Sequence, residues 1–309
     1  MPKSLSFLRA LTWIGMAALV VALGAPAAGV TSAAGACGAA TCLYLPTVST
    51  GCKAVGGSYN QGVVFQRDPD NPPKQASQHP GKNLDLRGYE QRTVGFSTSL
   101  IDYGSGGDPN APQFPTLFTT PRAIVSRYFQ IYSWDDFNNQ PGSLLSENNG
   151  SYPITALGLS TTAGETIRTP LANYDLGAGV AAVVLYADAD SVTVHYTRDD
   201  SSAYGYTIFI DNLCTDPNLL AKYTALDTGA RYVFAPGSGY DLPTLTANQP
   251  VGAASGSEIV VAITDAGPFV DPRTCNPGAG FWNSLGSLST NVACLGRNPG
   301  GGILSLPWT

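Results

Sequence analysis

The segment GVAAVVLYADADSVTVHYTRDD, residues 179–200, limits the fold more tightly than any other stretch of the chain. From Val192 to Tyr196, valine and tyrosine at every second position alternate with the polar residues Thr193 and His195. A period of two is that of a β-strand, whose successive side chains point to opposite faces. The ADAD sequence between the two apolar runs predicts a tight turn. We therefore expect two antiparallel strands in a sheet with one covered face, and His195 facing solvent or a groove.

Other stretches are also typical of strands. Residues 123–134 (AIVSRYFQIYSW), 204–213 (YGYTIFIDNL) and 258–267 (EIVVAITDAG) are rich in β-branched and aromatic residues. Only 12% of residues are charged, whereas 35 glycines and 23 prolines suit short strands joined by tight turns. The predicted fold is mostly β, with antiparallel sheets or a sandwich and short loops.

One short helix is predicted near residues 216–227. Asp216 can cap its first turn, Pro217 suits the first helical position, and Leu219, Leu220, Tyr223 and Leu226 form one apolar face. No other stretch shows apolar residues so clearly at helical spacing.

The first 36 residues resemble an export signal. Lys3 and Arg9 precede a short apolar run that ends in small residues, so cleavage after Ala27 or Ala36 is expected. An uncleaved anchor and lipidation at Cys37 are alternatives, but the apolar run is shorter than the about 20 residues that a membrane span needs. The remaining chain divides into an N-terminal β-rich region, residues 37–165, and a second β domain, residues 166–309. We expect a secreted or cell-surface protein.

The six cysteines of an exported chain are interpreted first as disulfides. Six cysteines allow about 15 connectivities. Cys275 and Cys294 flank a segment rich in glycine and proline, so we predict that a bridge between them ties down the C-terminal tail. Buried free thiols are the alternative for some of the cysteines.

The acidic charge of the chain argues against nucleic acid as a partner. The net charge is −6, and it becomes −8 once Lys3 and Arg9 leave with the signal. Such a surface repels phosphate backbones, and no basic patch opposes it.

Four stretches in order, within residues 171–273, resemble the lysostaphin-type metallopeptidases, a β-rich family that cleaves peptidoglycan cross-links. They are VVLYADADSVT, YGYTIFIDN, LTANQPVGAASG and EIVVAITDAGPFVDPR. The resemblance implies that the family's zinc-ligand aspartate falls on Asp175. The family's histidine positions fall on Leu171, Ala225, Glu258 and Val260, so only the aspartate is retained.

The histidine count leads to the same expectation. A catalytic zinc needs about three imidazole or carboxylate ligands and an open position for water. Hydrolysis of this kind uses three histidines, and the whole chain has two, His79 and His195. His79 with Asp85, six residues later, is a candidate displaced ligand pair, and an ordinary solvated loop is the alternative.

Other chemistry has weaker signals. Asp102, Asp108 and Asn110 in a glycine-rich loop offer the oxygen ligands that Ca²⁺ prefers, although the same residues are ordinary turn formers. Asp188 and Asp190 in the ADAD turn could hold a cation or be solvated. No other cofactor is expected. No G-x-S-x-G motif stands between a strand and a helix, and glutamates for glycoside cleavage are scarce.

Binding is better motivated than catalysis. The segment YSWDDFNNQ, residues 132–140, places Trp134 and Phe137 beside amides and carboxylates, as sugar-binding sites do, although both aromatics could be core residues at a strand end. We expect a non-catalytic cell-envelope or extracellular protein that binds peptidoglycan, another polysaccharide or a peptide, or is structural. Its cleft is predicted to be lined by Asp175, His195, Tyr204, Tyr206 and Glu258. One rival is a zinc peptidase that uses His79, Asp175 and His195, and another is an adhesin or surface-layer subunit that self-associates through edge strands.

Overall fold

The computed structural model describes residues 52–67, 74–103, 108–145, 152–233, 235, 238–275, 280–285 and 294–295. All of them belong to one unit that spans residues 46–309. The expected export signal, residues 1–36, and the cysteines Cys37 and Cys42 lie outside the described residues. None of the helices in the described part of the chain has the length and apolar character to cross a membrane.

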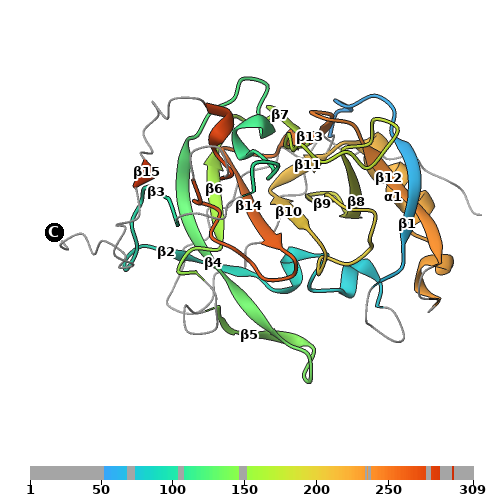
Figure 1. Ribbon diagram of the computed structural model, residues 1–309, viewed down its shortest axis with the longest axis horizontal. Helices are drawn as coiled ribbons and strands as arrows, with labels where there is room; N and C mark the ends of the chain where they lie inside the picture. The colour runs from blue at the N-terminus through green and yellow to red at the C-terminus, as the bar shows by residue number, and fades with distance from the viewer. Residues whose placement is uncertain are drawn as a thin grey trace, which may run out of the picture. The chain divides into compact units, whose positions relative to one another are not determined.

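The main element is a ten-stranded antiparallel sheet (Figure 1). Its order is β1-β12-β8-β9-β10-β14-β6-β4-β2, and β5 also pairs with β4. The prediction of a mostly β fold with antiparallel sheets is confirmed. The strands are β1 (Asn60–Phe65), β2 (Tyr89–Arg92), β4 (Val125–Asp135), β5 (Gln140–Leu144), β6 (Ala156–Ser160), β8 (Ala182–Ala187), β9 (Ser191–His195), β10 (Tyr206–Asp211), β12 (Gly239–Leu245) and β14 (Glu258–Asp265).

The described residues also form two smaller sheets. Strands β11 (Leu213–Thr215), β13 (Pro250–Ala254) and β7 (Thr166–Arg168) form an antiparallel sheet in that order. Strands β3 (Leu100–Ile101) and β15 (Cys294–Leu295) form a parallel pair. Short 3₁₀ helices are η1 (Ala76–Gln78), η2 (Leu84–Leu86), η3 (Phe114–Leu117), η5 (Gly229–Tyr232) and η6 (Asn283–Leu285).

Strands from both sides of residue 165 share the large sheet. Strand β6 pairs with β14, and β1 pairs with β12 (Figure 1). The N-terminal β-rich region and the second β domain, as the sequence suggested them, thus contribute to one layer.

The centre of the large sheet is buried on both faces. Ile208 and Ile210 of β10 belong to the larger core cluster, whereas Phe209 between them packs in a second cluster with Leu84 and Val260. The expectation of one covered face is therefore wrong for β9, all five residues of which are buried. The reason is the loop before η2, which packs over the second face: the Thr193 hydroxyl donates to the Lys82 carbonyl at 2.6 Å.

The predicted helix is confirmed as α1 (Pro217–Leu226). The Asp216 side chain accepts from the backbone N–H groups of Asn218 and Leu219, at 2.8 and 3.3 Å, which is the N-cap role expected from the sequence. Leu219 and Tyr223 form its buried face.

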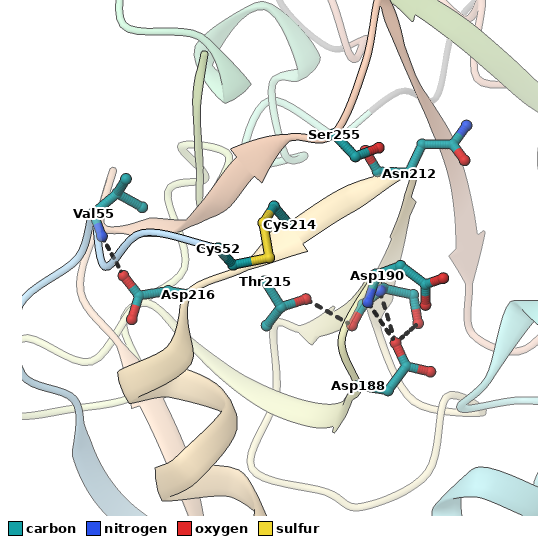
Figure 2. Close-up of a disulfide and its surroundings, with 10 residues drawn as sticks. Cys52, Val55, Asp188, Asp190, Asn212, Cys214, Thr215, Asp216 and Ser255 are labelled. Carbon is teal, nitrogen blue, oxygen red and sulfur yellow. Dashed lines mark hydrogen bonds between the residues drawn. A yellow bond between two sulfur atoms is a disulfide. The ribbon is translucent and has the colours of Figure 1, made fainter. Parts of the chain in front are cut away.

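A disulfide joins Cys52 to Cys214 of β11 across 162 residues of sequence (Figure 2). Beside it, the second oxygen of Asp216 accepts from the backbone N–H groups of Val55 and Gly56 at 2.5 and 2.7 Å. The segment before β1 is thus fixed to the start of α1 both covalently and by hydrogen bonds. Cys275 is also disulfide-bonded, and its pairing with Cys294 stays a prediction.

Candidate functional site

A groove of about 410 Å³ lies where four segments distant in sequence meet. We call it the Trp134 groove. Its walls come from the η1–β2 segment, from the β4–β5 hairpin and the residue after it, from the β9–β10 loop and from the turn after β14. These segments supply His79, Pro80, Gly81 and Arg87; Ser133, Trp134, Asp136 and Leu145; Ser201, Ser202 and Ala203; and Gly267.

The β4–β5 hairpin presents two aromatic residues at this groove and beside it. Trp134 lines the groove, and its indole N–H is shielded from solvent without a hydrogen-bond partner. Phe137 at the hairpin tip is 95% exposed, which rules out the core position considered for it. The tip is ordered by Asp135, which accepts from the backbone N–H groups of Phe137 and Asn138 at 3.0 Å each.

The wall from the η1–β2 segment is held by hydrogen bonds and carries a charge. The His79 Nδ1 atom accepts from the Gly81 N–H at 3.0 Å. A Cβ at Gly81 would lie 2.8 Å from the Ser202 hydroxyl, so the two loops approach closely here and a larger residue would displace that hydroxyl. Arg87 donates to the Pro80 carbonyl at 2.8 Å. Burial lowers the pKa of Arg87 to about 10, an effect that the nearby Asp136 carboxylate opposes, so the guanidinium is still charged at neutral pH.

This combination defines what the groove can bind. It offers an aromatic ring, three serines and one charge of each sign. Ligand sites typically combine an apolar or aromatic surface with a few fixed polar groups. A pyranose ring matches this set, because its C–H face stacks on an aromatic ring while its hydroxyls exchange hydrogen bonds at the edges.

The expectation that His195 faces solvent or a groove is wrong. Its side chain is fully buried. The Nδ1 atom is 2.9 Å from the Thr207 hydroxyl, and the Nε2 atom is 2.6 Å from the Thr197 hydroxyl. With both ring nitrogens engaged, the imidazole acts as part of the packed sheet face.

His195 should remain neutral far below the ordinary histidine pKa. Burial lowers its pKa to about 3. The unfolded chain titrates near the usual value of about 6.5, so between these two values the unfolded state binds more protons, and this group's contribution to stability is lost as pH falls. In an NMR titration the His195 ring signals should stay unshifted down to about pH 4, whereas histidines of the chain unfolded in urea titrate near pH 6.5. A native midpoint near pH 6.5 would contradict this assignment.

The other residues of the predicted cleft do not converge. Asp175 lies in an exposed turn after Tyr174, whose ring packs 6.1 Å from that of the buried Tyr206 on the larger core. Glu258 shares a strand face with Val260 of the second core and forms a 2.7 Å ion pair with Arg127. Asp175 accepts from the Gly177 N–H within its own turn, so the contacts of Asp175 and Glu258 do not bring the two residues together.

Tyr204 is 43% exposed, and the Arg67 guanidinium lies 5.5 Å from its ring centroid. It directly follows Ala203, which lines the Trp134 groove. Of the predicted binding residues, only Trp134 itself lines this groove, and His79, considered as a metal ligand, lines it as well.

The calcium prediction at Asp102, Asp108 and Asn110 stays a prediction, because residues 104–107 lie outside the described residues. Asp108 accepts from the Asn110 N–H at 2.8 Å and from the Tyr174 hydroxyl. This is the bonding of an Asx turn closed by a tyrosine.

Sequence reasoning missed Arg87 and the serines of the groove. Serines and an arginine in loops carry no local signal, because the same residues are common on any exposed turn. The one usable signal was the aromatic and acidic composition of the β4–β5 hairpin.

The comparisons with known proteins identify no relative. No family model matches the chain, and no curated protein or solved structure shows significant similarity to it.

Proposed function

We propose that this chain is an exported, non-catalytic cell-envelope or extracellular protein that binds peptidoglycan or another polysaccharide in the Trp134 groove. The observation that carries the proposal is the indole ring of Trp134 in a groove with three serines and both signs of charge. The exposed Phe137 extends the aromatic surface of the same hairpin.

Export is supported by two independent features. One is the basic and apolar N-terminal segment, and the other is the Cys52–Cys214 disulfide. Disulfides persist in oxidising compartments and are rare in reducing ones.

A zinc peptidase built from His79, Asp175 and His195 draws no support from the geometry. Both ring nitrogens of His195 bond to threonines, and Asp175 lies in an exposed turn. Within the described parts of the chain, the one group of three metal-ligating side chains with ligand atoms inside 4.8 Å contains only aspartates. Soft or imidazole ligands for zinc are not brought together there.

Trp134→Ala should weaken retention on insoluble peptidoglycan, or on whichever polysaccharide retains the wild-type chain, by at least about tenfold, which is about 1.4 kcal/mol. The loss is expected because the variant removes the stacking surface. Co-sedimentation at increasing polysaccharide concentration measures the effect.

Two variants make this test specific. Trp134→Phe keeps a stacking ring and should bind better than Trp134→Ala. Phe65→Ala removes an aromatic side chain that is 42% exposed on the edge strand β1, outside the groove, and should bind as the wild type does. If the wild type sediments with no polysaccharide, or if Trp134→Ala binds normally, the proposal fails.

A further inference from the structure

A second cluster of polar side chains lies away from the groove, at the turn between β8 and β9. Asp85 of η2 and Asp188 and Asp190 of the turn place their carboxylate oxygens within 4.8 Å of one another. Figure 2 shows the side chains of Asp188 and Asp190 at this turn. One oxygen of Asp188 accepts from the backbone N–H groups of Asp190 and Ser191, at 3.1 and 2.8 Å, so the turn is built around it.

A fourth carboxylate, that of Asp211, is buried against this cluster. Asp211 ends β10 and is the cross-strand partner of Ser191, the first residue after the turn. Its residue is 4% exposed, and both of its carboxylate oxygens are shielded from solvent without a hydrogen-bond partner. The Asp211 carboxylate interacts electrostatically with Asp85, Asp188 and Asp190, so it lies beside the three other aspartates.

The cluster is electrostatically costly as it stands. Burial raises the pKa of Asp211 well above its usual range, and the negative charge of the nearby Asp85 raises it further. Burial and a hydrogen bond with Asp188 raise the pKa of Asp190 to about 7. Like charges that share a poorly solvated site disfavour one another's ionisation. Either a shared proton or a bound cation can relieve this repulsion.

We propose that Asp85, Asp188 and Asp190 bind a divalent cation, with calcium as the best fit, and that the buried Asp211 carboxylate beside them strengthens the binding by its charge. All three ligands are hard carboxylate oxygens, which suit Ca²⁺ rather than zinc or copper. They come from a short 3₁₀ helix and a turn, and this irregular arrangement is tolerated by the flexible coordination of Ca²⁺ better than by the strict octahedron of Mg²⁺. The cation offsets the charge of the Asp211 carboxylate, which lacks a cationic partner.

The site also has a structural consequence. The η2 segment supplies Asp85 and continues directly into Arg87 of the Trp134 groove. A cation held by Asp85, Asp188 and Asp190 therefore fastens η2 to the β8–β9 turn. It stabilises the folded state whether or not the groove binds a polysaccharide.

The test is a thermal unfolding scan of the full chain with CaCl₂ or with EGTA, together with calorimetric titration of CaCl₂ into the chelator-treated protein. We expect one calcium ion per site and a rise in the unfolding midpoint of about 5 °C when calcium exceeds its dissociation constant about 100-fold. Asp190→Asn and Asp211→Asn should each weaken calcium binding at least about tenfold. Asp241→Asn, which removes a carboxylate that accepts from Gln61 of β1, is the matched control and should bind calcium normally.

The opposite outcome is equally clear. If the aspartates share a proton instead, calcium has no effect on the midpoint, the titration shows no heat at this site, and Asp211→Asn raises the midpoint in EGTA. That result overturns the proposal. Should Asp211→Asn fail to fold, Asp85→Asn replaces it, because Asp85 is exposed and its loss leaves no buried gap. Normal calcium binding by Asp85→Asn and Asp190→Asn would overturn the proposal too.

Discussion

Asp271→Ala is expected to lower the free energy of unfolding by about 3 to 5 kcal/mol. Asp271 and Arg273, in the DPR sequence after β14, form an ion pair of 2.5 Å with both side chains buried, 0% and 1% exposed. The Asp271 carboxylate also accepts from the Tyr103 hydroxyl at 2.7 Å. Removing it leaves the guanidinium of Arg273 uncompensated in the interior, and an unpaired buried charge is far more costly than a lost surface contact.

Glu165→Gln is the matched control for this prediction. It weakens the ion pair of Glu165 with Arg122, whose side chains are 22% and 28% exposed. Solvent screens that pair, so the change should cost about 1 kcal/mol or less. Urea unfolding followed by circular dichroism compares the two variants. A cost for Asp271→Ala no greater than that of Glu165→Gln would contradict the buried-pair argument.

The double variant Cys52→Ser/Cys214→Ser should lose about 4 kcal/mol of stability and unfold about 10 °C lower than the wild type. The bridge closes a loop of 162 residues, and cross-linking so long a loop restricts the unfolded chain strongly. The bridge also holds the segment before β1 beside Asp216, whose carboxylate accepts hydrogen bonds from the backbone N–H groups of Val55 and Gly56. Differential scanning calorimetry under non-reducing conditions measures the change.

Reduction provides the internal check on the disulfide prediction. Dithiothreitol should lower the midpoint of the wild type by at least as much as the double substitution does. Any further decrease on reducing the double variant reports the remaining disulfides, among them the one that Cys275 makes. A double variant as stable as the oxidised wild type would show that the loop closure adds nothing.

The local elements of this fold follow from local sequence. Asp216 and Pro217 mark the start of α1, because a carboxylate can cap free N–H groups and proline suits the first turn, and the helix begins there. The alternation from Val192 to Tyr196 predicts a strand, and β9 is observed there. In the same way, the predicted strand at 258–267 is observed as β14. Backbone conformation is decided within a few residues, and these signals are short.

Which surfaces are covered was decided only by tertiary contacts. The segment around η2, which carries Leu84, packs over the polar face of β9 and buries His195. The period of two in β9 cannot show this. The Trp134 groove and the cluster of Asp85, Asp188 and Asp190 with the adjacent Asp211 likewise join residues far apart in the chain. The physical reason is that side-chain periodicity specifies the orientation of a residue along its own strand, whereas burial depends on which distant segment packs against that face.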